Sequence, residues 1–225
     1  SHLNIKKPVS IVGHSMGVNI ALEFYEKYQS LVKNFILISG SATFPLKKNL
    51  SIKSFLFGQS IAKVFDGVFP VWVDELWKMQ TKLPGSHKMA AWMGFNKKLS
   101  AKKDIQKVVQ VISGFSPKVF IQLLGEMLHC DQSEIIEEIK VPTLVIAGEK
   151  DRMVPLSLSR LLHQQIKESD YHVVKKGSHC PQLDRPKEVS LVIEHFLLKN
   201  EKARALETLD VKKSHHRTLD NLALS

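Results

Sequence analysis

The chain has 225 residues with a formal charge of +10, and 44% of them are hydrophobic. This composition is that of a globular domain with a sizeable core. The basic excess is scattered as short lysine pairs, without a long basic run or a nucleic-acid motif, so we expect no nucleic-acid partner. The two cysteines, and the lack of a signal peptide and of an apolar stretch of bilayer length, predict no disulfide framework and a cytoplasmic location.

The N-terminal part, residues 1–42, predicts a strand-helix-strand unit. Residues 8–13 form a short apolar run typical of a buried strand. Residues 18–28 carry apolar side chains at helical spacing, and residues 34–40 are a second continuous apolar run. Strand, helix and strand in this order form the repeating unit of a parallel sheet.

Residues 43–139 differ from this pattern. They contain amphipathic stretches punctuated by glycine and proline, and we find no strand of core type among them. The sequence therefore predicts an all-helical insert, a cap. Its large apolar side chains are Phe55, Phe57, Phe65, Phe69, Trp72, Trp77, Met89, Trp92, Met93 and Phe95.

Strand and helix patterns alternate again in residues 140–199. In chain order they predict a strand at 141–148, a helix at 155–166, a strand at 171–174 and a closing helix at 186–198. Residues 200–225 are polar and charged, and we expect a frayed helix or a disordered tail there. The fold class is thus α/β, with a mostly parallel sheet interrupted by the helical cap.

Residues 13–17 spell GHSMG and fit the pattern G-x-S-x-G between the first predicted strand and helix. A nucleophilic serine needs a sharp, strained turn here. Bulkier residues two positions before and after it would clash, which explains the glycines Gly13 and Gly17. The turn exposes the Ser15 hydroxyl. It also directs the Met16 backbone N–H, at the helix N-terminus, to the place where an oxyanion forms. The sequence therefore predicts Ser15 as a nucleophile with Met16 as an oxyanion donor.

A serine hydroxyl is a weak nucleophile and needs a base, which in turn needs an orienting carboxylate. Asp151 follows the predicted strand at 141–148, and His179 follows the one at 171–174. Active sites assemble at the carboxyl ends of parallel strands, and the chain order of serine, acid and histidine matches one known order. We therefore predict Asp151 as the acid and His179 as the base.

Other polar side chains lie nearby. Glu149 falls closer to its strand than Asp151 does, so we prefer Asp151. Asp184 is interpreted as a solvated or helix-capping group, and Cys180 as a small packing residue. The remaining histidines of predicted helices and strands are interpreted as surface or core residues: His163, His172 and His195.

These segments resemble the α/β-hydrolase superfamily. The resemblance rests on GHSMG, on VPTLVIAGEKDRMVP and on KKGSHCPQLDRPKEV, and it covers about residues 8–198. It implies the same nucleophile, acid and base, no metal and no cofactor. Val18 departs from the pattern, because many relatives carry a second glycine at this position.

The resemblance also predicts what lies outside the sequence. Family members usually have about four strands before the nucleophile strand, and one early loop supplies a second oxyanion donor. This sequence begins about eight residues before that strand, so we expect the nucleophile strand to form an exposed, apolar edge of the sheet. Our hypothesis is that this sequence is a fragment or truncated product of a full hydrolase.

A serine nucleophile indicates acyl transfer, and the apolar cap favours a small ester-like substrate with an apolar part. The preferred function is a carboxylesterase or lipase-like serine hydrolase. Carbon–carbon bond hydrolases, amidases and acyltransferases share the same three residues and remain alternative functions. An inactive fragment or a binding module is a further alternative. Membrane association through residues 54–73 is a less favoured alternative, and the sequence leaves the oligomeric state undetermined.

Overall fold

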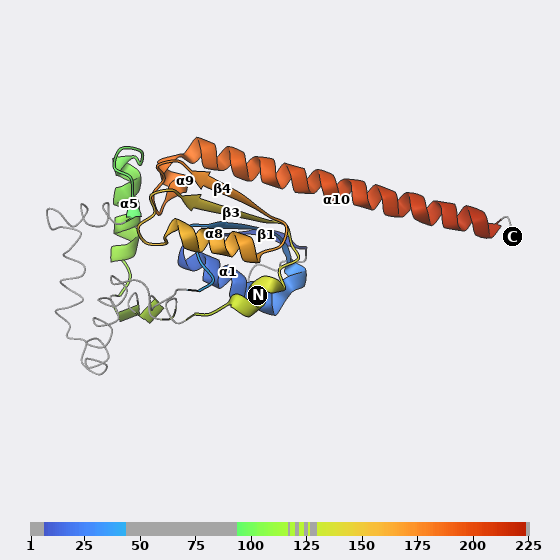
Figure 1. The fold of residues 1–225 in the computed structure, drawn as a ribbon, viewed down its shortest axis with the longest axis horizontal. Helices are drawn as coiled ribbons and strands as arrows, with labels where there is room; N and C mark the ends of the chain where they lie inside the picture. Colours follow the sequence, from blue (N-terminus) through green and yellow to red (C-terminus); the bar gives the residue numbers. More distant parts are fainter. Residues whose placement is uncertain are drawn as a thin grey trace.

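The computed structural model describes residues 7–43, 94–116, 118–119, 122–123, 126 and 130–223. These residues form an α/β fold around one parallel sheet (Figure 1). The strands are β1 (Val9–His14), β2 (Val32–Ile38), β3 (Thr143–Gly148) and β4 (Ser169–Val174). The helices are α1 (Met16–Tyr28), η1 (Gln29–Leu31), α5 (Lys102–Ser113), α7 (Ser133–Glu137), α8 (Leu156–Gln165), α9 (Pro181–Asp184) and α10 (Pro186–Ala223).

The sheet has the order β1-β2-β3-β4, and every neighbouring pair is parallel. The predicted strand-helix-strand unit is present as β1, α1 and β2, and the later alternation as β3, α8, β4 and α10. Because all strands run in one direction, their carboxyl ends lie along one edge of the sheet, on the side of α5 and α9 (Figure 1).

Helices cover both faces of the sheet. On one face, α1, α7 and α8 pack with the sheet around a core that includes Leu22, Phe35 and Ile136. On the other face, α10 packs through Val189 and Phe196 against side chains of β2 and β3. A fully buried side chain of this size contributes about 1.5–3 kcal/mol relative to its exposed state. The two-sided core explains why β3 is buried at all six positions.

β1 is an edge strand, as expected. In the described part of the chain it pairs only with β2, and Val12 is 59% exposed. Among the residues that the structure places, no strand pairs with its outer N–H and C=O groups, which is the arrangement of a sheet edge.

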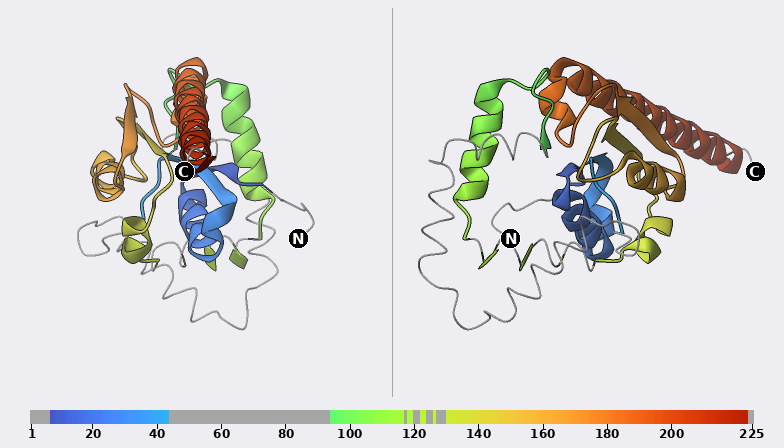
Figure 2. Two further views of the ribbon diagram at one scale, coloured as in Figure 1. Left: turned by 90° about the vertical axis from the view of Figure 1, so that its right-hand side faces the viewer. Right: turned by 60° about the vertical axis from the view of Figure 1, so that its left-hand side comes forward.

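The closing helix is longer than the sequence analysis predicted. We expected it to end at Leu198 before a frayed or disordered tail, but α10 continues to Ala223 and projects beyond the sheet (Figures 1 and 2). No glycine or proline follows Pro186, and residues 200–210 are rich in Glu, Lys, Ala and Leu. These residue types favour a helix, and nothing in the sequence interrupts it.

Most of the predicted cap, residues 44–93, lies outside the described residues. The alternative membrane-binding stretch, residues 54–73, lies outside them too, and so do all the apolar side chains assigned to the cap except Phe95. The described remainder contains α5, which stands at the end of the molecule opposite the tip of α10 (Figure 2). Thr43 and Asp131 form an antiparallel bridge, so the start of the predicted insert lies beside a residue near its end. Within the described ranges, no helix has both the length and the apolarity needed to cross a bilayer.

Candidate active site

Ser15 occupies the turn between β1 and α1 in a strained conformation. Its φ of 55° and ψ of −122° lie in a region that non-glycine residues rarely adopt. The turn is held by two backbone hydrogen bonds, from Ser15 N–H to Ile38 O and from Val18 N–H to Ser15 O, each 2.9 Å long. Met16 begins α1, so its N–H is among those that have no partner within the helix.

The two glycines of the turn differ in how closely they are packed. A Cβ at Gly13 would lie 2.6 Å from the Gly17 carbonyl oxygen, so only glycine fits there without a backbone shift. A Cβ at Gly17 would meet no atom of the described residues within 4 Å, so the clash that we expected there is not seen among them. The crowding is one-sided because it is the backbone of Gly17 that fills the space beside Gly13.

Val18, which departs from the family pattern, is accommodated by a glycine elsewhere. Its side chain is fully buried, and a Cβ at Gly40 would lie 2.2 Å from it. The absence of a side chain at Gly40 thus leaves room for the larger residue at position 18.

The structure brings Ser15, His179 and Asp151 into one chain of hydrogen bonds. His179 Nε2 lies 2.9 Å from Ser15 Oγ, and His179 Nδ1 lies 3.0 Å from Asp151 Oδ2. With the ring proton on Nδ1, His179 donates a hydrogen bond to Asp151 through Nδ1 and accepts one from the Ser15 hydroxyl at Nε2. The side chains of His179 and Asp151 are 6% and 1% exposed, so water competes little for these contacts.

The backbone fixes the carboxylate of Asp151. Its Oδ1 accepts the N–H groups of Met153 at 2.8 Å and Val154 at 2.9 Å, and Oδ2 is the oxygen nearer to His179 Nδ1, at 3.0 Å against 3.2 Å for Oδ1. The loops after β3 and β4 also bind each other, since Lys150 N–H donates to Gly177 O at 2.7 Å. The acid and the histidine are therefore held as one unit.

The alternative candidates occupy other positions. The Glu149 carboxylate accepts a hydrogen bond from the Lys176 N–H at 2.9 Å, so one of its oxygens is bonded to the backbone and not to His179. His163 bonds to Ser169, and His172 to Glu188. Burial, together with the charges of Asp184 and Asp151, raises the pKa of the Cys180 thiol to about 12, so this cysteine stays protonated and a poor nucleophile.

Two polar side chains beside His179 were missed or misassigned from the sequence. His14 Nε2 lies 2.8 Å from the His179 carbonyl oxygen, and their ring centroids are 5.0 Å apart. Burial, and next the charge of His179, lower the pKa of His14. Asp184, interpreted as solvated or helix-capping, is instead buried and bonded to the residue before His179. Its short distance from His179 in sequence was the one available signal.

The family model for the alpha/beta hydrolase fold matches residues 1–186. The chain belongs to this family. As an alpha/beta hydrolase it is similar to the monoacylglycerol lipase ABHD6 of Rattus norvegicus, which is 22% identical over 85% of this chain and 55% of its own length. The pyrrolizixenacetamide deacetylase of Xenorhabdus hominickii is 24% identical over 85% of this chain and 66% of its own length.

A solved structure shows the same fold. The thermophilic esterase of Thermogutta terrifontis superimposes with a TM-score of 0.65 and 22% identity, over 88% of this alpha/beta hydrolase chain and 68% of the esterase. The chain spans about half the length of the first curated relatives that it matches, 55% for the rat lipase.

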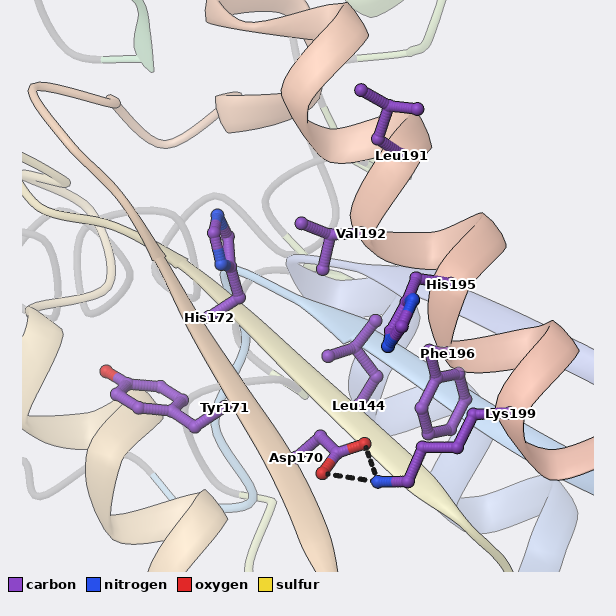
Figure 3. Close-up of a pocket in the computed structure, with 9 residues that line it drawn as sticks. All are labelled: Leu144, Asp170, Tyr171, His172, Leu191, Val192, His195, Phe196 and Lys199. Carbon is purple, nitrogen blue, oxygen red and sulfur yellow. Dashed lines mark hydrogen bonds and ion pairs between the residues drawn. The ribbon is translucent and has the colours of Figure 1, made fainter. Parts of the chain in front are cut away.

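A groove of about 470 Å³ lies elsewhere on the alpha/beta hydrolase, between β4 and α10 (Figure 3). It is lined by residues that include Leu144, His172 and Phe196, and an ion pair from Lys199 to Asp170 spans it. Ser15, Asp151 and His179 do not line it. The groove is therefore separate from the candidate active site.

Proposed function

We propose that this chain carries the active site of a serine hydrolase that cleaves a carboxylic ester or a related acyl bond. Ser15 is the nucleophile, His179 the general base and Asp151 the acid that orients it. The observation that supports this assignment is the chain of hydrogen bonds of 2.9 Å and 3.0 Å from Ser15 Oγ through His179 to Asp151. These distances are those required of a nucleophile, a base and an orienting group.

The reaction follows from this arrangement. Ser15 Oγ attacks the acyl carbonyl while His179 Nε2 takes its proton, and the carbonyl oxygen becomes an oxyanion. His179 then returns the proton to the leaving alcohol, which departs as the acyl-enzyme forms. A water molecule, deprotonated by His179, hydrolyses the acyl-enzyme and regenerates Ser15. Asp151 holds the ring in the tautomer with Nδ1 protonated and stabilises the imidazolium.

Met16 contributes its backbone N–H to the oxyanion. This group lies at the N-terminus of α1, where the helix dipole favours negative charge. A second donor is expected in this chemistry, and losing one such donor costs about 10²–10³ in rate. No metal or organic cofactor is needed, because every step uses side chains and backbone of the protein.

The proposed substrate is a small ester with an apolar acyl or alcohol part. The relatives named as a monoacylglycerol lipase and a deacetylase support acyl-bond cleavage in general, and the apolar composition of residues 43–139 favours an apolar substrate. Carbon–carbon bond hydrolysis, amide hydrolysis and acyl transfer on the same three residues are the alternatives. The free thiols of Cys130 and Cys180 suit the reducing environment of the cytoplasm, which we include in the proposal.

Labelling with a fluorophosphonate probe tests the nucleophile directly, because the probe forms a covalent bond to an activated serine. We expect the wild-type chain and Ser157→Ala to be labelled, and Ser15→Ala to remain unlabelled. Ser157 is an exposed serine on α8 and therefore a matched control. If the folded wild-type chain is not labelled, the proposal is wrong and a non-catalytic binding domain becomes the better interpretation.

A further inference from the structure

Asp184 is a buried carboxylate that the proposed reaction does not use. It ends α9, five residues after His179, and is 5% exposed. Its two oxygens face two different parts of the chain. Oδ1 accepts the Asn96 N–H at 3.2 Å and bonds to the Ser100 hydroxyl, whereas Oδ2 accepts the Ser178 N–H at 2.5 Å.

The bond to Ser178 acts on the backbone that carries the base. Ser178 immediately precedes His179, and its hydroxyl lies 2.6 Å from Asp184 Oδ2 and 3.0 Å from Gly94 O. Since the Ser178 N–H is buried, it would be left without an acceptor if Oδ2 were lost. The loop would then have to shift to satisfy this N–H, and His179 would shift with it.

The packing around Ser178 makes such a shift matter. A Cβ at Gly148 would lie 1.9 Å from Ser178 O, so the loop is already packed closely against the end of β3. Asp184 binds the N–H and the hydroxyl of the same residue. Reactions of this kind need their groups aligned to within about 1 Å, and a misplacement of that size costs about 10²-fold in rate.

We propose that Asp184 is a positioning residue that fixes His179 between Ser15 and Asp151 by binding Ser178, and that it links this loop to residues 94–100. The proposal rests on the function proposed above for those three residues. Through Asn96 and Ser100, the described end of the insert is bonded to the same carboxylate that holds the base.

The isosteric variant Asp184→Asn separates shape from acceptor capacity. An amide has one oxygen and one NH2 group, so it can accept from the Ser178 N–H or from the Asn96 N–H, but not from both. We expect kcat on p-nitrophenyl butyrate to fall about tenfold to a hundredfold, with KM within about twofold of the wild type. Asp170→Asn, which changes a partly exposed aspartate paired with Lys199, is the control and is expected to leave both constants unchanged.

A spectroscopic readout distinguishes positioning from general stability. The low-field proton resonance of His179 Nδ1–H, assigned by its loss in His179→Gln, reports the hydrogen bond to Asp151. We expect this resonance to broaden or disappear in Asp184→Asn at a temperature where circular dichroism shows the variant folded. An unchanged resonance together with an unchanged kcat overturns the proposal.

Two serine variants keep the proposal testable if Asp184→Asn does not fold. Ser178→Ala removes a hydroxyl on the His179 side of Asp184, and Ser100→Ala removes one on the far side. We expect Ser178→Ala to lower kcat more than Ser100→Ala does; equal effects or the reverse order overturn the proposal. If the wild-type chain has no esterase activity and no probe labelling, the proposed function fails, while the His179 resonance still decides whether Asp184 positions the ring.

Discussion

The two halves of the candidate active site are built differently. Asp151 and His179 follow β3 and β4, which are neighbours in the sheet, and their loops bond to each other through Lys150 N–H and Gly177 O. Ser15 follows β1, an edge strand that pairs only with β2 in the described part of the chain. β3 is buried at all six positions, whereas burial alternates along most of β1.

This difference indicates where the geometry is most constrained. The loops that carry Asp151 and His179 have several close backbone contacts, so a small change there has little room to relax. The turn at Ser15 is bonded to Ile38 O at the end of β2, and it contacts the loop of His179 through Ser15 Oγ to His179 Nε2 and through His14 Nε2 to His179 O. We therefore expect an added side-chain atom to cost more at the end of β3, beside the loop of His179, than at the start of α1, although Gly13 at the end of β1 is also crowded by backbone.

The largest expected effect comes from adding one methyl group to each half. In Gly148→Ala the Cβ would lie 1.9 Å from the Ser178 carbonyl, and a backbone atom cannot move aside as a flexible side chain can. We expect the free energy of unfolding to fall by about 3 kcal/mol and probe labelling to be lost. In Gly17→Ala the Cβ meets nothing within 4 Å, and we expect a change within about 0.5 kcal/mol.

Urea unfolding of the two alanine variants and of the wild type measures this contrast. Equal destabilisation of both would show that the halves are equally constrained, and the comparison would then be wrong.

Truncating one valine in each half gives a smaller effect. Val145 on β3 is 1% exposed and packs in the core, so we expect Val145→Ala to cost about 2 kcal/mol. Val12 on β1 is 59% exposed, and we expect Val12→Ala to change the free energy of unfolding by less than about 0.5 kcal/mol. A large loss in Val12→Ala would mean that the β1 edge is covered in solution, and analytical ultracentrifugation would show whether a second copy covers it.

The sequence was informative where the chemistry demands a residue type at a set position. Ser15 stands in a G-x-S-x-G pattern, and Asp151 and His179 each follow a strand, so the order of elements was enough to select side chains that the structure places within hydrogen-bond distance. The four described strands were predictable from their apolar runs, although their ends differ from the prediction by one or two residues at most boundaries.

The sequence was uninformative where a residue's role depends on contacts distant in the chain. Asp184 and His14 carry no motif of their own. The first binds Asn96, 88 positions away, and the second contacts His179 O, 165 positions away. The space around Gly13 and Gly17 likewise depends on how β1 and α1 meet. The polarity of residues 200–225 left a frayed helix and a disordered tail both open, and α10 continues through residue types that favour a helix.

The smallest expected effect concerns His14, which contacts both halves. Burial, followed by the charge of His179, lowers the pKa of His14, and these causes outweigh its hydrogen bond to His179 O and the charge of Asp151. Above the ordinary value of 6.5 the ring is neutral in both the folded and the unfolded chain. As the pH falls below 6.5, the unfolded chain takes up a proton that the folded chain resists, so the free energy of unfolding decreases.

The variant His14→Gln tests this expectation, because glutamine keeps an N–H donor for the His179 carbonyl but does not titrate. In urea unfolding across a pH series, we expect the variant to lose less stability than the wild type below 6.5 and to show the same slope above it. Parallel curves at acid pH would mean that His14 takes up its proton as readily in the folded chain as in the unfolded one, and that the contact between the two halves does not depend on a neutral ring.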